Sequence, residues 1–315
     1  MTDWVFSQAE WPQTALDPAG PHAASVHWLH MGMLILMVAV VAITMLALVV
    51  AWFVRLERSP VWIIWTGGLA FPLVVLVGLI AVNSDVTRAV SALAGPDELV
   101  IEVTGKQFWW DVRYPAEGGQ EAIRTANEIH IPTGRPVRFR LLSDDVIHSF
   151  WVPALGGKRD MIPGRENELV LVADRPGRFR GQCAEFCGQQ HARMALEVVA
   201  HAPAAFEEWR DEQTRPRLTP DHPQLRAGRQ AFSDLGCAAC HEIRGVAEGG
   251  RLGPDLSNYG ERDRMGAGIW PNTIGNTAGW IVDVQRMKPG AEMPSYTDID
   301  GPTLRAVAAY LQSLR

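Results

Sequence analysis

The four cysteines of this 315-residue chain fall in two close pairs, which indicate metal or cofactor chemistry before a disulfide scaffold. The first pair, Cys183 and Cys187, is followed by His191 and Met194, so two thiolates, an imidazole and a thioether lie within twelve residues. Soft ligands of these kinds select copper. A loop between two strands can fold all four around one point, so the segment predicts a copper site.

The number of sulfur ligands decides which copper site is expected. One cysteine, two histidines and a weak methionine would hold a single copper ion of the blue type. A second cysteine allows both sulfurs to bridge two ions, which then share one electron. The missing imidazole should come from an upstream strand, and His148 ends an alternating run there. A disulfide between Cys183 and Cys187 is the alternative.

The second pair stands in the pentad Cys237-Ala-Ala-Cys240-His241. This spacing is that of covalent c-type haem, in which two thiols form thioethers with the porphyrin vinyl groups and the adjacent histidine binds the iron. A zinc or redox pair is the alternative, although a redox pair usually requires a βαβ context that this region lacks. We therefore expect a haem domain around the pentad.

The other iron ligand should be a methionine or histidine from a later loop. Met293, which is followed by Pro294, is the favoured candidate, and Met265 and Met287 are its competitors. A methionine inside a helix, as predicted for Met287, is more often a packing residue than a ligand. A methionine ligand would raise the iron potential, which suits a carrier that reduces copper.

Short alternating stretches predict the strands that position the copper ligands. Leu99, Ile101 and Val103 alternate with more polar residues, and Gly or Pro turns separate this stretch from similar ones further on. Strands of this length and spacing predict an antiparallel sandwich or barrel. The other stretches cover residues 137–141, 168–172 and 194–199.

Two apolar segments precede the predicted strands. Residues 31–54 and 61–84 contain no Asp, Glu, Lys or Arg, and each segment is long enough to cross a bilayer. Arg55 and Arg58 place the connecting loop in the cytoplasm by the positive-inside rule, whereas the first 26 residues carry no basic residue. Both termini are therefore expected outside. A cleaved signal peptide is the alternative for the first segment.

The last third of the chain has helical periodicity. Leu225, Phe232 and Leu235 predict a helix that leads into the haem pentad, and residues 302–314 place apolar side chains on one face. Between 201 and 222, Pro, Glu, Arg and Thr are frequent and no apolar period is sustained. That composition predicts a linker.

The remaining charged residues indicate no further site. The 29 basic and 35 acidic residues give a net charge of −6, which disfavours a nucleic-acid partner. From Pro216 onward, basic and acidic residues are equal in number, so the haem region is neutral. Three histidines outside the ligand pattern are expected to face solvent or lie in turns: His130, His201 and His222.

The copper segment resembles the binuclear copper A motif of subunit II of the haem-copper oxidases, and the haem region resembles a class I cytochrome c fused to it. The resemblance covers nearly the whole chain. It implies a multidomain membrane protein with a two-helix transmembrane hairpin, an all-β cupredoxin domain and a small all-α cytochrome c domain. The implied outward segment, hairpin, copper domain, linker and haem domain cover residues 1–26, 27–85, 86–200, 201–222 and 223–315.

The resemblance also implies a role for each copper ligand. The two cysteines would bridge the copper ions, the two histidines would bind one ion each, and the methionine would be a weak axial ligand. Glu185 would donate its backbone carbonyl, and its side chain would reach a magnesium ion at the boundary with the catalytic subunit. The implied copper ligands are His148, Cys183, Glu185, Cys187, His191 and Met194.

Phe108, Trp109 and Trp110 resemble the family's aromatic stretch near the copper, so they are expected to conduct electrons. The stretch usually begins with the tryptophan that receives the incoming electron, and this chain has Phe108 there. The family also often has a proton-path glutamate at the start of the second helix. This chain has Trp62 at that position, and Glu57 is a possible substitute.

The resemblance implies that electrons pass from an external carrier through the haem and copper A to a catalytic subunit, which reduces dioxygen to water and pumps protons. The implied partners are catalytic subunit I, subunit III and lipid of the bacterial inner membrane, with both redox domains on the outer face. Two alternatives are a nitric oxide reductase with a copper A subunit and a membrane-anchored copper chaperone. A chaperone of that type would have a thioredoxin fold and usually one span.

Fusion of the carrier to the copper domain turns docking into an intramolecular event, which reduces the need for a receiving tryptophan at position 108. We therefore expect Phe108→Trp to leave haem-to-copper electron transfer nearly unchanged in the assembled complex. The rate is measured after rapid photoreduction of the haem. A strong acceleration would contradict the argument.

Overall fold

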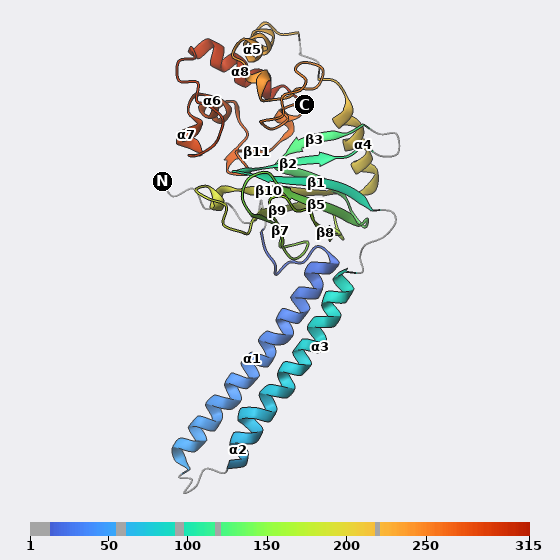
Figure 1. Cartoon of the computed structure of the whole chain (residues 1–315), viewed down its shortest axis with the longest axis vertical. Helices are drawn as coiled ribbons and strands as arrows, with labels where there is room; N and C mark the ends of the chain where they lie inside the picture. Colours follow the sequence, from blue (N-terminus) through green and yellow to red (C-terminus); the bar gives the residue numbers. More distant parts are fainter. Residues whose placement is uncertain (1–12, 55–60, 92–97, 117–120, 218–220) are drawn as a thin grey trace.

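A computed structural model describes residues 13–54, 61–91, 98–116, 121–217 and 221–315 of the chain, without the side chains of residues 89–91. It consists of a hairpin of long helices, a β-sandwich and a helical domain on the far side of the sandwich (Figure 1). This architecture confirms the predicted fold class. The predictions for Arg55, Glu57, Arg58 and the first twelve residues lie outside the described part of the chain.

Two long helical segments form the hairpin and run side by side (Figure 1). The first is α1, Pro21–Phe53; the second consists of α2, Val61–Trp65, a π-helical turn, Thr66–Ala70, and α3, Phe71–Ser91. The π turn ends two residues before Pro72, which cannot donate a backbone hydrogen bond and disturbs a regular helix. The most apolar stretches of both segments have no buried residue, so lipid or partner helices must cover them.

The residues just before α1 are attached to the β-sandwich. The Ala19 N–H donates to the Ala154 carbonyl at 2.7 Å, and the Asp174 N–H donates to the Ala19 carbonyl at 2.8 Å. Asp17 forms an ion pair with Arg175 at 2.7 Å. The described start of the chain therefore lies on the same side of the hairpin as the sandwich.

Ten strands form the sandwich in two five-stranded sheets. One sheet has the order β3-β2-β1-β5-β8, with β3 Ile123–Ala126, β2 Trp109–Tyr114, β1 Leu99–Lys106, β5 Val137–Ser143 and β8 Asn167–Leu171. The other has the order β4-β10-β9-β6-β7, with β4 Glu128–Pro132, β10 Ala195–His201, β9 Gly177–Cys183, β6 His148–Trp151 and β7 Arg159–Met161.

Alternation along the strands builds the core between the sheets. Every second residue of β1 is buried, beginning with Leu99, and the fully buried aromatic residues include Trp110, Phe139 and Phe150. The prediction of a purely antiparallel sandwich is wrong for two pairings, because β1 pairs with β5 and β10 pairs with β4 in parallel. Alternation fixes which face of a strand is buried but not the direction of its neighbour.

The segment assigned to a linker contains a helix, and this prediction is wrong for residues 203–214. Helix α4, Pro203–Thr214, packs against the sandwich through the buried Phe206 and through Trp209. The Trp209 ring stacks on His130 with 4.2 Å between ring centroids. His130 and His201 are therefore partly buried, with 2.7 Å between their ring nitrogens, and do not face solvent as expected.

The helical domain begins with α5, Pro223–Asp234, as its periodicity predicts. Helices α6, Ile274–Val282, α7, Val284–Met287, and α8, Gly301–Gln312, follow after irregular segments. Short 3₁₀ turns cover His191–Arg193, Cys237–Ala239 and Tyr259–Glu261, and β11, Arg264–Met265, pairs with β12, Trp270–Pro271. Phe232 of α5 and Tyr310 of α8 lie in the core of this domain.

Gly228 sets the approach of α5 to α8, because a Cβ atom there would lie 2.1 Å from the Ala306 carbonyl oxygen. We expect Gly228→Ala to destabilise the haem domain by about 1–3 kcal/mol through overpacking. Gly275→Ala is the matched control, since Gly275 lies in a helix with open space around its Cβ position and should gain about 0.5 kcal/mol. Calorimetry of the full chain measures both. Equal effects of the two substitutions would contradict the close crossing.

Candidate metal centres

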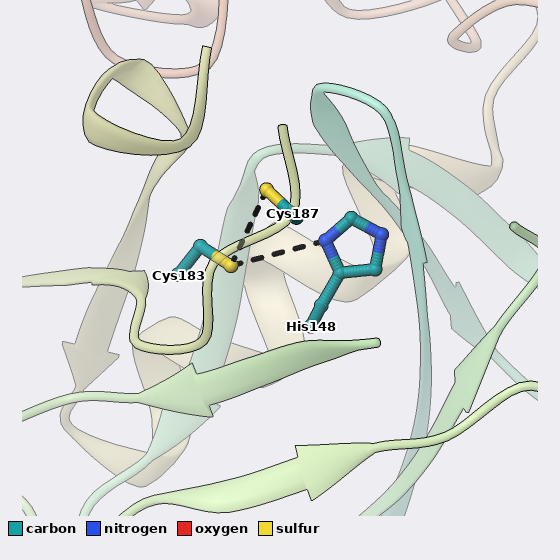
Figure 2. A group of neighbouring side chains, drawn as sticks. All are labelled: His148, Cys183 and Cys187. Carbon is teal, nitrogen blue, oxygen red and sulfur yellow. Dashed lines mark hydrogen bonds between the residues drawn. The ribbon is translucent and has the colours of Figure 1, made fainter. Parts of the chain in front are cut away.

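One end of the sandwich gathers the six predicted copper ligands. Figure 2 shows three of them, His148, Cys183 and Cys187. Strand β6 begins with one ligand, β9 ends with another, and the loop between β9 and β10 carries the rest. The Cys183 sulfur lies 3.8 Å from His148 Nδ1, 3.8 Å from the Cys187 sulfur and 3.2 Å from the Glu185 carbonyl oxygen. The Cys187 sulfur lies 3.8 Å from both His191 Nδ1 and Met194 Sδ.

The two sulfurs are not bonded to each other. Both Cys183 and Cys187 are free and buried, and their separation of 3.8 Å is nearly twice the disulfide length of about 2.05 Å. Each sulfur faces a different imidazole, His148 on one side and His191 on the other. Two central sulfurs with one nitrogen on each side suit two soft metal ions, so the donor set fits binuclear copper.

Hydrogen bonds to the backbone hold the ligand loop in place. The Cys183 N–H donates to the Met194 carbonyl at 2.9 Å, which closes the loop where the strands meet. The Ala184 N–H donates to Ser149 O at 3.0 Å, and the Gln107 side-chain amide donates to the Cys187 carbonyl. The fold therefore restrains the backbone that carries the predicted ligands.

Two residues that the sequence analysis did not single out orient His148. The His148 Nε2–H donates to Asp145 Oδ1 at 2.7 Å, which leaves Nδ1 unprotonated and directed at the Cys183 sulfur. Gly105 makes room for the ring, because a Cβ atom there would lie 2.8 Å from His148 Cδ2. An aspartate three residues before a ligand histidine was the available sign in the sequence.

The contact between the two thiols shifts their pKa values in opposite directions. The hydrogen bond with Cys187 lowers the pKa of Cys183 to about 3, and the same contact raises the pKa of Cys187 above its ordinary value. Burial opposes the charged form of His148, but hydrogen bonds with Cys183 and Asp145 raise its pKa. Metal ligation by both sulfurs must release the proton of Cys187, so copper should bind more tightly as pH rises.

The Glu185 carboxylate is about half exposed and lies 3.4 Å from Lys158 Nζ. Lys158 also forms an ion pair with Asp160 at 3.0 Å. This acidic pair and its lysine lie on the surface beside the ligand loop. The magnesium contact of Glu185 stays a prediction.

The three predicted aromatic residues differ in placement. Trp110 is fully buried, with its ring centroid 6.2 Å from that of His148. Phe108 is also buried, whereas Trp109 is partly exposed and lies 5.7 Å below the Lys106 ammonium. The strand alternation of β2 separates the two tryptophans onto opposite faces. Of the two, Trp110 is therefore the ring against a copper ligand.

The haem pentad follows α5 and places His241 in a close-fitting turn. The His241 Nδ1–H donates to the Pro254 carbonyl at 2.8 Å, which leaves Nε2 unprotonated. Burial lowers the pKa of His241 and favours the neutral imidazole that an iron ligand needs. A Cβ atom at Gly253 would lie 2.5 Å from the ring. Cys237 and Cys240 are both free, so the residues of the pentad fit covalent haem.

Contacts of the methionines separate the candidates for the other iron ligand. Met265 is buried in the core, and its sulfur accepts a hydrogen bond from the Tyr259 hydroxyl at 3.5 Å. Met293 lies in a loop, partly exposed, and its sulfur accepts a hydrogen bond from Trp280 Nε1 at 3.2 Å. Trp280, which the sequence analysis did not assign, thus holds the favoured methionine. The ligation itself stays a prediction.

The haem domain is docked on the copper domain. Arg124, on β3, forms an ion pair with Asp111 at 2.9 Å and donates to the carbonyls of residues 250, 251 and 253, in the turn around His241. Arg178, on β9, pairs with Asp263 at 2.9 Å. The sequence predicted only a linker between the two domains, whereas these contacts form a defined interface between them.

Together, these features define a membrane-anchored protein with a cupredoxin-type copper domain and a cytochrome c domain. A family model described as "Cytochrome C oxidase subunit II, periplasmic domain" matches residues 115–201, and one described as "Cytochrome c" matches residues 225–315.

Similar proteins carry the same description. A "Cytochrome c oxidase subunit 2" of Alkalihalophilus pseudofirmus is 36% identical over 324 residues, which cover 96% of this chain and 91% of the relative. Another of Bacillus subtilis is 32% identical over 70% of this chain and 63% of its own length. The solved periplasmic domain of subunit II of cytochrome oxidase from Bradyrhizobium japonicum is 34% identical over 36% of this chain and 92% of its own, with a TM-score of 0.34. The chain belongs to the cytochrome c oxidase subunit II family.

Substitution of Asp145 tests the predicted copper site without changing a ligand. We expect Asp145→Asn to weaken copper binding by about 10–100-fold, because His148 loses the acceptor that orients its ring. Asp144→Asn is the matched control, since Asp144 forms an ion pair with Lys106 at the surface. Competition with a copper chelator measures both affinities. Equal affinities of the two variants would show that Asp145 does not orient the ligand.

Proposed function

We propose that the chain is the subunit through which electrons enter a terminal respiratory oxidase. It would receive electrons from an external carrier and pass them to a catalytic subunit that reduces dioxygen to water with proton pumping. The convergence of two thiols, two imidazoles, a thioether and a carbonyl at one end of the sandwich carries this proposal. Covalent haem c and binuclear copper A would supply one-electron chemistry at the two sites.

The copper domain favours electron exchange because its ligands are fixed. His148 and His191 would each hold one ion, and Cys183 and Cys187 would bridge the pair. The loop hydrogen bonds and the buried Trp110 restrict movement of these ligands, so little rearrangement should accompany a change of charge. A rigid site that admits no exchangeable substrate ligand suits transfer better than catalysis.

The haem domain supplies the other ligand set. Cys237 and Cys240 would tether the haem, His241 would bind one face of the iron, and Met293 the other. The Pro254 carbonyl and the Trp280 indole hold these two ligands in orientation. A methionine ligand raises the iron potential, as a donor to copper needs when it accepts electrons from another carrier.

The membrane hairpin would attach the subunit to its partners. Residues 55–60 would face the cytoplasm, which places both redox domains on the outer face of a bacterial inner membrane. The exposed apolar faces of α1 and α3 offer surfaces for helices of catalytic subunit I, with lipid and subunit III covering more distant parts. Glu185 would contribute to a magnesium site at the boundary with subunit I.

Absorption spectra of the purified chain test the assignment of the two sites. We expect c-type haem bands together with near-infrared copper absorption. Cys183→Ser should abolish the copper absorption and keep the haem bands, whereas Cys240→Ser should reduce covalent haem attachment and keep the copper. Loss of both features in either single variant would indicate unfolding. A wild-type chain without either feature would contradict the proposal.

Identification of the final electron acceptor requires the assembled complex. Oxygen consumption that stops in the Cys183→Ser complex supports a terminal oxidase, and nitric oxide consumption in its place supports the alternative reductase. The β-sandwich disfavours the copper chaperone, because that hypothesis predicts a thioredoxin fold.

A further inference from the structure

Lys288 connects the haem domain to the copper domain through a buried ammonium group. It is one of only three lysines in a chain with 29 basic residues, and it is 4% exposed. Its Nζ donates to the carbonyls of Phe108 at 2.7 Å, Gly266 at 2.8 Å and Arg193 at 3.1 Å. All three acceptors are backbone oxygens, and two of them belong to the copper domain.

The acceptors belong to three different segments of the chain. Phe108 lies between β1 and β2, and Arg193 immediately precedes the ligand Met194. Gly266 belongs to a turn of the haem domain whose next residue, Ala267, accepts a hydrogen bond from the Ala195 N–H at 3.0 Å. One ammonium group thus ties the aromatic segment, the copper loop and this turn together.

The Phe108 ring lies between the ligand loops of the two centres. A Cβ atom at Gly188, in the copper loop, would lie 3.3 Å from this ring. A Cβ atom at Gly290, in the haem domain, would lie 3.5 Å from it. Gly290 stands between Lys288 and the favoured iron ligand Met293. Both loops therefore contact the same buried aromatic ring, from which a free carrier is excluded.

The chemistry of this contact requires lysine. A buried cation is costly unless its donors are satisfied, and an ammonium has three donors that these three carbonyls match. Burial lowers the pKa of Lys288 to about 7. In general, hydrogen bonds donated by a charged group favour its charged form. The planar fork of an arginine cannot meet three convergent acceptors in the same way.

We propose that Lys288 is a positioning residue for electron transfer within the chain, because it pins the Met293 loop of the haem domain against the Phe108 ring and the copper ligand loop. This inference rests on the proposed function and deepens it by naming the contact between the two centres. External carriers must then dock on the haem domain, since the haem domain covers Phe108.

The test uses Lys288→Met in the full chain, which removes the charge and the three donors and keeps an apolar stem. Hydrogen exchange at the Ala195 amide reports the interface, and the haem-to-copper rate after photoreduction of the haem reports transfer. We expect exchange at Ala195 to accelerate and the rate to fall, each at least tenfold, with both absorption spectra retained. Arg286→Met removes an exposed charge two residues away and should change neither quantity.

The two measurements separate the inference from the function on which it rests. If hydrogen exchange at the Ala195 amide is unchanged in Lys288→Met, with or without bound metals, Lys288 does not hold the two domains together. Faster exchange with an unchanged rate overturns the role in electron transfer. A wild-type chain without haem or copper absorption contradicts the proposed function, while the exchange measurement still decides whether Lys288 holds the interface.

A second substitution, Lys288→Arg, tests the proposal if Lys288→Met does not fold. Lys288→Arg keeps the charge but replaces the three-donor ammonium with a planar group. If Lys288→Met loses its metals, Lys288→Arg should still accelerate exchange at Ala195 and slow the transfer, both more mildly. Wild-type values of both quantities in Lys288→Arg would overturn the requirement for an ammonium.

Discussion

Two thiols that lie 3.8 Å apart without a bond between them are the constraint on which the copper domain depends. Close thiols form a disulfide when the backbone lets them meet, so the fold has to hold them apart and still close together. The hydrogen bond from the Cys183 N–H to the Met194 carbonyl closes the loop at its base, and the Gln107 amide holds the Cys187 carbonyl. The sandwich supplies both restraints from strands distant in sequence.

The haem domain also contacts the copper ligand loop. Arg124 and Arg178 hold that domain by contacts with strands of the sandwich, and Lys288 binds the Phe108 carbonyl. A neutral domain has no net charge with which to steer itself to a partner, so short-range contacts of this kind must define the docking. The fused carrier is therefore a built part of the structure and not a partner on a flexible connection.

This interface gives a physical reason for Phe108 at a position where the family usually has tryptophan. In a subunit that meets a free carrier, an aromatic ring at this position serves best when solvent and the carrier can reach it. Here the ring is buried and the glycines at 188 and 290 allow two loops to approach it. The loss of tryptophan is consistent with a position that no free carrier reaches.

Much of the architecture followed from local patterns, since uncharged segments of bilayer length, alternating strands and closely spaced ligands are written in consecutive residues. The copper loop and the haem pentad were recognisable because metal chemistry restricts residue type and spacing. The linker was misjudged because helix α4 is mostly polar and owes its position to Phe206 and Trp209, which pack on strands already folded. The two parallel pairings were not predicted for a related reason, because the direction of a strand's neighbour depends on the topology of the whole sheet.

By itself, the sequence predicted the two ligand sets, and it determined the pair of long apolar helices and the fold class, because each depends on residues close together in the chain. Only the tertiary structure decided that Asp145 orients His148, that Trp280 holds Met293 and that Lys288 joins the two redox domains. A lysine 180 residues from its acceptor has no local pattern to mark it. Its role arises because folding buries the ammonium where three carbonyl oxygens converge, and only then does the cost of desolvation make the position specific.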